Sequence, residues 1–224
     1  MSEEEYLEKA NQYLEKVLEA NKITNVTRIT DADTARILHI EDSLVGLPEV
    51  QDAPEGLLGD LGSGGGFPGV PLALATGRPT VLVDSVGKKM ALVHSLLEEM
   101  GLDEQIETSS ERIEDLGRFR SGEFSVVTAR ALSKLVSLLE LAAPLLKMGG
   151  RLVCYKAKVS EEELDDALRI EELVGMKLVS RRETVLSDRE TARTILVFEK
   201  VSRPKLKLPR RVGLAQKQPL KPRL

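Results

Sequence analysis

The 224-residue sequence contains very little cysteine and histidine, which narrows the chemistry that it can support. Cys154 is the single cysteine, so no disulfide can form within the chain. The two histidines and this cysteine do not form a zinc-ligand set. Tryptophan is absent, and four Phe with three Tyr are too few for a surface on which bases stack. We therefore expect neither a metal site nor a base-stacking platform.

Long hydrophobic runs are also missing. No apolar segment approaches the ~18 to 20 residues that a membrane-spanning helix requires. The opening residues, MSEEE, are acidic, whereas a secretory signal begins with basic residues. These features predict a soluble, cytoplasmic protein without a membrane partner, and we expect it to be a monomer.

Charge is distributed unevenly along the chain. Residues 202–224 carry eight Lys and Arg and no acid, whereas the preceding part carries 24 basic and 36 acidic residues. A basic segment of this kind is typical of a surface that binds a polyanion, although a tail that only aids solubility would look the same. Four prolines argue against a regular helix here. The sequence thus predicts an extended basic arm over residues 203–224.

Helical patterns dominate the first 52 residues. Apolar residues between positions 3 and 21 recur at the spacing of one helical stripe with an acidic outer face. A second helix is expected over residues 31–45, with Asp31 or Asp33 as its N-cap, and Pro48 is expected to stop it. Residues 1–52 are therefore predicted to form a small N-terminal helical region.

From about residue 57, short apolar runs alternate with amphipathic segments, which predicts parallel strands joined by helices. Expected strands lie at 56–61, 80–84, 105–108, 124–128 and 151–155, and expected helices near 68–76, 86–100, 111–117, 133–147 and 160–174. Two further strands, 177–186 and 194–201, are joined by a turn so short that they must be antiparallel. We predict an α/β domain over residues 53–202, with about seven strands in a doubly wound sheet and an antiparallel hairpin at its edge.

The loop DLGSGGGFPG, residues 60–69, carries the strongest local signal. It lies between a predicted strand and a helix, and it places five glycines within eight residues. Glycine backbone can approach a ligand closely, and the following helix presents its positive end to that ligand. This arrangement is typical of a nucleotide-type site, although the glycines would also suit a tight turn without a ligand.

Two nucleotide-binding patterns fit this loop. Gly64, Gly66 and Gly69 form a G-x-G-x-x-G motif, and Asp84 follows at the distance of a ribose-binding acid, which would suit NAD. In the other phase, Asp60 precedes Gly62-x-Gly64-x-Gly66, a pattern that resembles the loop of class I S-adenosylmethionine methyltransferases. The sheet of those enzymes also ends in an antiparallel hairpin, which favours the second interpretation.

Several segments besides the glycine motif have distinctive sequences. They are EANK at 19–22 with NVT at 25–27, HIEDS at 39–43, DLGSGGGFPGVP at 60–71, VDSVGKK at 83–89, TARA at 128–131, and PRRVG at 209–213 with KQPL at 217–220. Together they make the chain resemble one family, the RsmG or glucose-inhibited division protein B family of 16S ribosomal RNA guanine-N7 methyltransferases. The family often has Trp at the position of Ala20 and Arg at that of Leu38. Neither departure affects the glycine loop.

The resemblance implies S-adenosyl-L-methionine as cofactor and assigns positions around it. These positions are Gly62 and Phe67 near the methionine part, Asp84, Ser85 and Val86 at the ribose and adenosine, Ile113 and Glu114 beside the adenine, and Arg130 next to the cofactor. From the residues alone, Asp84 is well placed at a strand end, whereas a glutamate such as Glu114 is more often a solvated helix carboxylate.

Arg130 is also the expected catalytic residue. It follows an apolar run and should lie at the carboxyl edge of the sheet, where its guanidinium could orient a phosphate or a guanine edge. Lys88 and Lys89 lie in the first turn of a helix, where the helix dipole disfavours cations, and RNA phosphate is one candidate partner. The roles of His39 and Asp42 stay open, since they also suit a packed helix.

The implied reaction is methylation of guanine N7 in the 530 loop of 16S rRNA, with naked rRNA or the small ribosomal subunit as partner. Guanine N7 carries a lone pair and no proton, so direct in-line transfer needs no general base. We expect the basic arm to contact RNA and to leave cofactor binding to the body. The alternatives are a class I methyltransferase with another substrate, an NAD-dependent oxidoreductase and a non-enzymatic RNA-binding protein.

Overall fold

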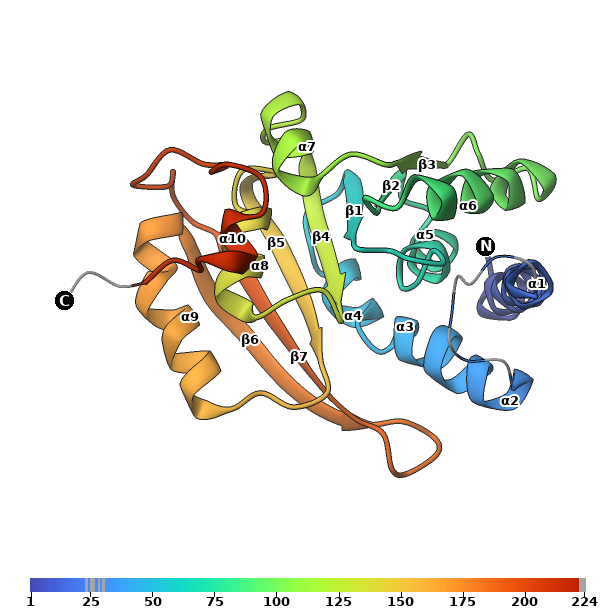
Figure 1. Cartoon of the computed structure of the whole chain (residues 1–224). Coiled ribbons are helices and arrows are strands. Elements are labelled where there is room, and N and C mark those ends of the chain that lie inside the picture. Colours follow the sequence, from blue (N-terminus) through green and yellow to red (C-terminus); the bar gives the residue numbers. More distant parts are fainter. Residues whose placement is uncertain (23, 25–26, 28, 30, 222–224) are drawn as a thin grey trace.

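The computed structural model describes residues 1–22, 24, 27, 29 and 31–221. Its centre is a seven-stranded sheet in the order β3-β2-β1-β4-β5-β7-β6 (Figure 1). The strands are β1 Leu57–Leu61, β2 Thr80–Val83, β3 Ile106–Ser109, β4 Phe124–Arg130, β5 Leu146–Lys156, β6 Met176–Val185 and β7 Ala192–Lys200. Strands β1 to β5 are parallel, and β7 lies antiparallel between β5 and β6. The predicted α/β sheet with an antiparallel edge hairpin is confirmed.

The strand order places the candidate site. The chain moves outward from β1 through β2 to β3, and then returns to the other side of β1 as β4. In open α/β sheets, such a reversal leaves a crevice at the carboxyl ends of the strands. Leu61 pairs with Val83 of β2 and with Ala129 of β4, so the glycine loop and Arg130 leave the sheet at the same edge.

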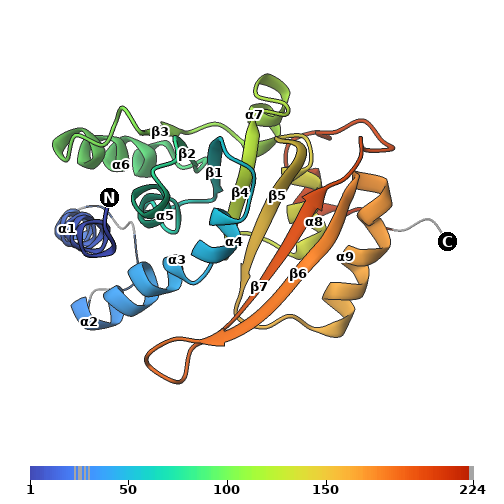
Figure 2. The same cartoon turned by 180° about the vertical axis from the view of Figure 1, so that it is seen from behind.

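Helices cover both faces of the sheet (Figures 1 and 2). On one face pack α7 Ile113–Phe119, α8 Leu135–Ala142 and α9 Glu161–Val174. On the other pack α4 Leu47–Gln51, α5 Gly69–Thr76 and α6 Gly87–Glu99, with α1 Glu3–Asn21 outside them. Tyr13 and Val17 of α1 are buried together with Val70 and Leu74 of α5. The N-terminal helix thus shares a core with the sheet domain, and the expected boundaries at residues 52 and 202 stay predictions.

The second N-terminal helix has an unusual centre. Asp31 accepts a hydrogen bond from the Thr34 N–H and caps α2 Ala32–Ala35, as one of the two expected caps. The chain then continues through a π-helical turn, η1 Arg36–Glu41, into α3 Asp42–Leu44. Single π-turns occur mostly at functional sites. Pro48 ends this run but also lies in the first turn of α4, where proline is tolerated.

The expected helix over residues 133–147 is too long by about two turns. Helix α8 has eight residues and ends at Ala142, and β5 already begins at Leu146. Pro144 explains the early stop, because it has no N–H to donate to the carbonyl four residues earlier, even though Ala143 before it keeps a helical conformation. The strand gains its extra residues through a register shift between Phe124 and Val126 of β4.

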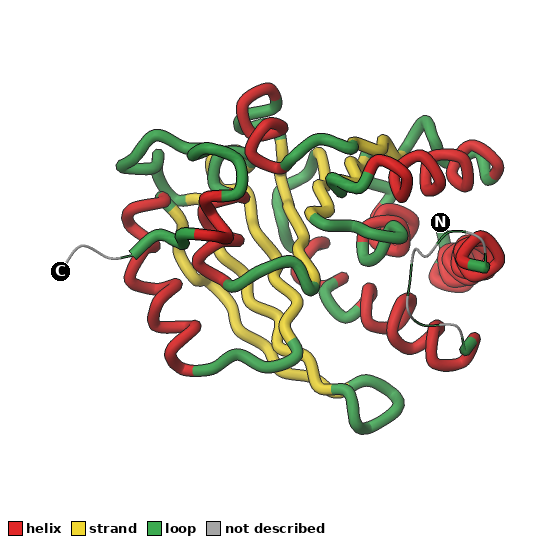
Figure 3. The backbone as a smooth tube through the Cα atoms, in the orientation of Figure 1, coloured by secondary structure: helices red, strands yellow, loops and turns green. Residues whose placement is uncertain are grey.

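The C-terminal segment is not simply an extended arm. It contains a short helix, α10 Leu214–Lys217, which packs against α8 (Figure 3). The four prolines flank the stretch 210–218 rather than interrupt it. Gly213 starts the helix in a left-handed conformation, and Ala215 is buried. In the described part of the chain, no helix is long and apolar enough to cross a membrane.

Candidate functional site

Asp60, at the end of β1, anchors the glycine loop from below. Its side chain is fully buried, Oδ1 accepts a hydrogen bond from the Thr128 hydroxyl at 2.9 Å, and Oδ2 accepts one from the Gly69 N–H at 2.9 Å. Burial raises the pKa of Asp60 to about 6, and the two hydrogen bonds offset this rise only partly. The carboxylate thereby ties the start of α5 to β4 and fixes the span of the loop.

Three glycines of the loop have left-handed backbone conformations and serve different purposes. A Cβ at Gly62 would lie 2.8 Å from the Leu132 side chain, and one at Gly66 would lie 2.4 Å from the Tyr13 hydroxyl. Gly64, in contrast, faces open space. Two positions therefore let other parts of the protein come close, and the third leaves the outer side of the loop free for a ligand.

A cavity of about 100 Å³ lies beside this loop and brings five of the expected cofactor residues together. They are Gly62, Asp84, Ser85, Ile113 and Glu114. Asp84 Oδ2 accepts the Gly64 N–H at 3.1 Å, and Oδ1 accepts the Val86 N–H at 2.9 Å, so this carboxylate organises both loops that border the cavity. Val86 itself is 46% exposed next to these residues and does not line the cavity.

Glu114 differs from a solvated helix carboxylate. Its side chain is buried, and Oε1 accepts the backbone N–H of Gly213 from the C-terminal segment at 2.7 Å. Gly213 and Gln216 complete the wall of the same cavity. No local pattern in the sequence indicates this contact, because 99 residues separate the two partners.

Phe67 lies on the other side of the glycine loop and does not line this cavity. Its buried ring stacks on His39 with centroids 4.6 Å apart, and it meets Tyr13 at 5.6 Å in a tilted arrangement. The Tyr13 hydroxyl donates to the Gly65 carbonyl at 2.9 Å. This aromatic cluster of Tyr13, His39 and Phe67 braces the loop from the N-terminal helices.

His39 is held as a neutral ring. Burial lowers its pKa to about 4, and the nearby Arg130 charge adds to that effect. The Nε2 atom shares a hydrogen bond with the Thr27 hydroxyl at 2.9 Å. A neutral His39 that stacks on Phe67 and binds Thr27 is suited to positioning its neighbours. It is not suited to act as a general acid or base at neutral pH.

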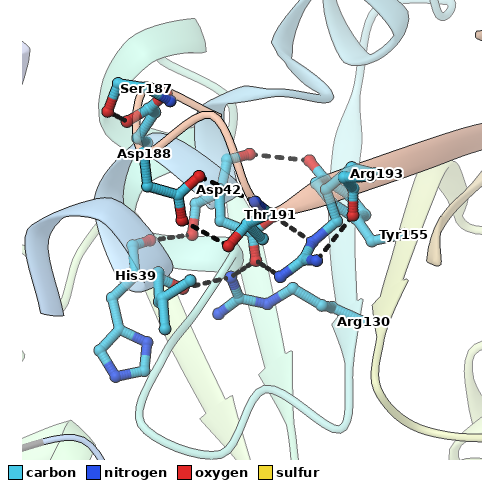
Figure 4. Close-up of polar contacts among 12 residues, drawn as sticks. His39, Asp42, Arg130, Tyr155, Ser187, Asp188, Thr191 and Arg193 are labelled. Atoms are coloured by element: carbon cyan, nitrogen blue, oxygen red, sulfur yellow. Dashed lines mark hydrogen bonds and ion pairs between the residues drawn. The ribbon is translucent and has the colours of Figure 1, made fainter. Parts of the chain in front are cut away.

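Arg130 reaches back from the end of β4 to the N-terminal helices. Its Nη1 atom donates to the Leu38 carbonyl at 2.9 Å and to Asp42 Oδ2 at 2.8 Å. Arg193 of β7 binds the same carboxylate through Nε at 2.7 Å and Nη2 at 3.1 Å. Figure 4 shows both guanidinium groups at the buried Asp42. Sequence reasoning missed Arg193, since a charged residue near the turn of a hairpin gives no sign of a contact with a distant helix.

A second cavity of about 310 Å³ adjoins Arg130. Its wall includes Arg130, Leu132, Tyr155, Lys156 and Arg193. Leu132 also lines the first cavity, so the two cavities share this residue. Arg130, expected beside the cofactor, thus borders the second cavity and not the first.

The paired lysines Lys88 and Lys89 are placed in the first turn of α6, as expected. Lys88 is exposed, Lys89 is half-buried, and neither forms an ion pair with any residue that the structure describes. Their charges are therefore free to meet an anion from outside, three and four residues along the chain from Ser85 in the wall of the first cavity.

Comparison with known proteins identifies the family. The family model GidB, described as rRNA small subunit methyltransferase G, matches residues 6–191. Proteins named ribosomal RNA small subunit methyltransferase G from Lactobacillus johnsonii and Fervidobacterium nodosum are each 35% identical over 213 and 220 residues. These matches cover 93% and 97% of this chain and 89% and 100% of the relatives.

Solved structures share the fold at lower identity. A geranyl diphosphate methyltransferase in complex with SAM has a TM-score of 0.58 and 14% identity, covering 72% of this chain and 85% of that chain. TrmN from Thermus thermophilus has a TM-score of 0.57 and 20% identity, covering 71% of this chain and 48% of that chain. The resemblance inferred from the motifs is confirmed, and the chain belongs to the rRNA small subunit methyltransferase G family.

Proposed function

We propose that this methyltransferase transfers a methyl group to N7 of a guanine in the 530 loop of 16S rRNA, acting as a monomer in the cytoplasm. The observation that carries the proposal is the pair of cavities at the carboxyl edge of the sheet that share Leu132 in their linings. The cavity beside the glycine loop has the features of a pocket for S-adenosylmethionine. The cavity beside Arg130 has room for the guanine base and a guanidinium to bind it.

The residues of the first cavity, which we call the donor pocket, fit S-adenosylmethionine. Each carboxylate oxygen of Asp84 accepts one backbone N–H and retains capacity to accept a ribose hydroxyl. Gly64 leaves the loop open above it, and Ile113 offers an apolar side chain to the adenine. When bound, the donor supplies an electrophilic methyl group on a sulfonium. We propose Gly62, Asp84, Ser85, Val86, Ile113 and Glu114 as its binding residues.

Phe67 acts on this pocket through the loop in the same proposal. It is buried behind the glycines, between His39 and Tyr13, so it fixes the path of the backbone that approaches the methionine part. A loop held on both sides keeps one geometry, and a fixed geometry is what in-line transfer requires.

Arg130 is the proposed catalytic residue on the substrate side. Nη1 is its only hydrogen-bonding atom toward the described residues, which leaves Nε and Nη2 for guanine O6 or a phosphate. The Asp42 carboxylate and the Leu38 carbonyl hold the guanidinium in place. Arg130 thereby orients the base, and Leu132 lines both the cavity beside it and the donor pocket.

No general base is needed, because N7 attacks with its own lone pair and releases no proton. Proximity and orientation alone supply up to roughly 7 to 11 kcal/mol of barrier lowering. His39 suits this scheme, since its depressed pKa keeps it neutral and its Nε2 is bound to Thr27.

RNA contact is assigned to the cations that have no partner within the protein. Lys205 pairs with Glu172 and Arg210 with Glu140, so two of the eight tail cations are already neutralised. The exposed cations Arg203, Lys207, Arg211, Lys217 and Lys221 form no ion pair with the described acids. Together with Lys88 and Lys89, they are the cations that we assign to RNA.

The experiment incubates the protein with labelled S-adenosylmethionine and either naked 16S rRNA or small subunits that lack the modification. Mass spectrometry of the nucleosides should detect new 7-methylguanosine, and Arg130→Ala should abolish it while changing S-adenosylhomocysteine affinity by less than about threefold. Methylation at another atom, or full turnover by Arg130→Ala, would contradict the proposal. Equilibrium binding of S-adenosylhomocysteine against NAD tests the oxidoreductase alternative separately.

A further inference from the structure

Hydrogen bonds with body helices hold residues 210–216 of the C-terminal segment in place, and one of them reaches the wall of the donor pocket. Arg210 binds Glu140 of α8 through Nε and Nη2, both at 2.6 Å. The Ser137 hydroxyl donates to the Ala215 carbonyl at 2.6 Å, and the Gly213 N–H donates to Glu114 at 2.7 Å. All three acceptors or donors on the body belong to α7 and α8, so residues 210–216 lie across these helices (Figures 1 and 3).

The ion pair with Glu140 is the main fastening. Glu140 is 2% exposed in a helix whose eight residues are all buried, so its charge has no access to water. A buried carboxylate needs a partner of opposite charge that also satisfies its hydrogen bonds, and Arg210 does both through a bidentate pair. The segment therefore docks where the body would otherwise hold an uncompensated charge.

Gly213 determines where the segment meets the pocket. Its φ of +81° is left-handed, and a Cβ there would have no neighbour closer than the Lys217 side chain at 3.9 Å. Glycine is thus required by the backbone conformation and not by lack of space. This conformation aims the N–H at Glu114 Oε1, and that bond fixes one oxygen of a carboxylate in the pocket wall.

We propose that residues 210–216 form a wall of the donor pocket, and that Gly213 and Arg210 are positioning residues for donor binding through Glu114. The inference rests on the proposed function, because it takes the cavity beside the glycine loop as the donor site. It replaces the expectation that the tail serves RNA alone. The tail has two sides: its exposed cations face outward, and Gly213 and Gln216 face the pocket.

The main test compares one substitution at two left-handed glycines. Gly77, which ends α5 at the opposite edge of the sheet, has φ +70° and equally open surroundings, so Gly77→Val imposes similar strain far from the pocket. Gly213→Val should weaken S-adenosylhomocysteine binding about tenfold in calorimetry and raise KM for the donor, with kcat at saturating donor little changed. Gly77→Val should leave this affinity unchanged despite a comparable loss of Tm.

Two further variants distinguish a positioning role from a loss of folding. Asparagine tolerates the left-handed conformation, so Gly213→Asn should bind S-adenosylhomocysteine with an affinity within about threefold of wild type. In a Glu114→Ala background, Gly213→Val should have little further effect on donor affinity, because the bond that it disturbs is already gone.

The outcomes distinguish the inference from the proposed function. Wild-type affinity of a folded Gly213→Val variant, or an equal loss in Gly77→Val, would overturn the role of the tail and leave the donor site standing. If the wild-type protein itself does not bind S-adenosylhomocysteine, the proposed function fails instead.

Discussion

Asp60→Asn tests the cost of keeping an ionised carboxylate beneath the glycine loop. Burial raises the Asp60 pKa to about 6 from its reference value of 3.8. Each pKa unit corresponds to about 1.4 kcal/mol, so ionisation of this group costs the folded state about 3 kcal/mol. Between pH 4 and pH 6 the folded chain retains a proton that the unfolded chain has released. The contribution of Asp60 to unfolding free energy therefore falls as pH rises through this window and stays low above it.

Asparagine can preserve both contacts without the charge. Its Oδ1 can accept the Gly69 N–H, and its Nδ2 can donate to the Thr128 oxygen, whose hydroxyl then turns to the Gly59 carbonyl at 3.3 Å. We expect Asp60→Asn to raise the unfolding free energy by about 1 to 3 kcal/mol at pH 7.5 and to lose most of that advantage near pH 4. Asp60→Leu is the matched control, because it leaves the Gly69 N–H without an acceptor and should destabilise at every pH.

The measurement is urea-induced unfolding of both proteins from pH 4 to pH 7.5. His39 acts in the opposite direction: its pKa is lowered to about 4, so it removes stability as pH falls below about 6.5. Because wild type and Asp60→Asn share His39, its effect cancels in their difference. A difference that does not vary with pH, or an Asn variant less stable than wild type at pH 7.5, would refute the reasoning.

Three other perturbations have expected outcomes. Asp42→Asn leaves two half-buried guanidinium groups without their buried counter-charge and should cost about 3 kcal/mol in urea unfolding; a loss below about 1 kcal/mol would contradict the pairing at a buried carboxylate. His39→Gln should gain stability relative to wild type as pH falls from 6.5 to 4, and parallel pH profiles would show that His39 is not desolvated. Replacing Lys207 and Arg211 by Ala should reduce the log–log salt slope of rRNA binding by about 1.4 if each contacts one phosphate, with donor affinity unchanged. An unchanged slope would remove these two cations from the RNA surface.

The sheet could be predicted from the sequence because its signals are local. Apolar runs such as 80–83 and 124–127 are bounded by polar or glycine residues, and their alternation with amphipathic stretches determines parallel pairing. Prediction failed where two local signals competed. The run LLELAAPLL continues the helical pattern beyond Pro144, yet the proline ends α8 at Ala142 and the following residues join β5.

The site was predictable to the extent that it follows strand ends. Gly62, Asp84 and Ser85 leave two adjacent parallel strands, and so they must meet at one edge. Asp42 and Arg193 are 151 residues apart, and Glu114 and Gly213 are 99 apart. Such pairs form only once the helices have packed, and no periodicity in the sequence records them. The family resemblance supplied the role of Glu114 but not the partner that buries it.

The N-terminal helices and the C-terminal segment both contact the candidate site, although the sequence analysis predicts them to be extensions of the α/β domain. From the N-terminal helices, the Tyr13 hydroxyl binds the glycine loop and Asp42 holds Arg130. From the C-terminal segment, Gly213 holds Glu114. The proposed reaction uses no general base and would gain its rate from placing the guanine and the donor in line, so every contact that fixes this geometry should contribute to the rate. Variants in either extension should therefore impair methylation in proportion to how far they release Arg130 or Glu114, even where sheet stability is unchanged.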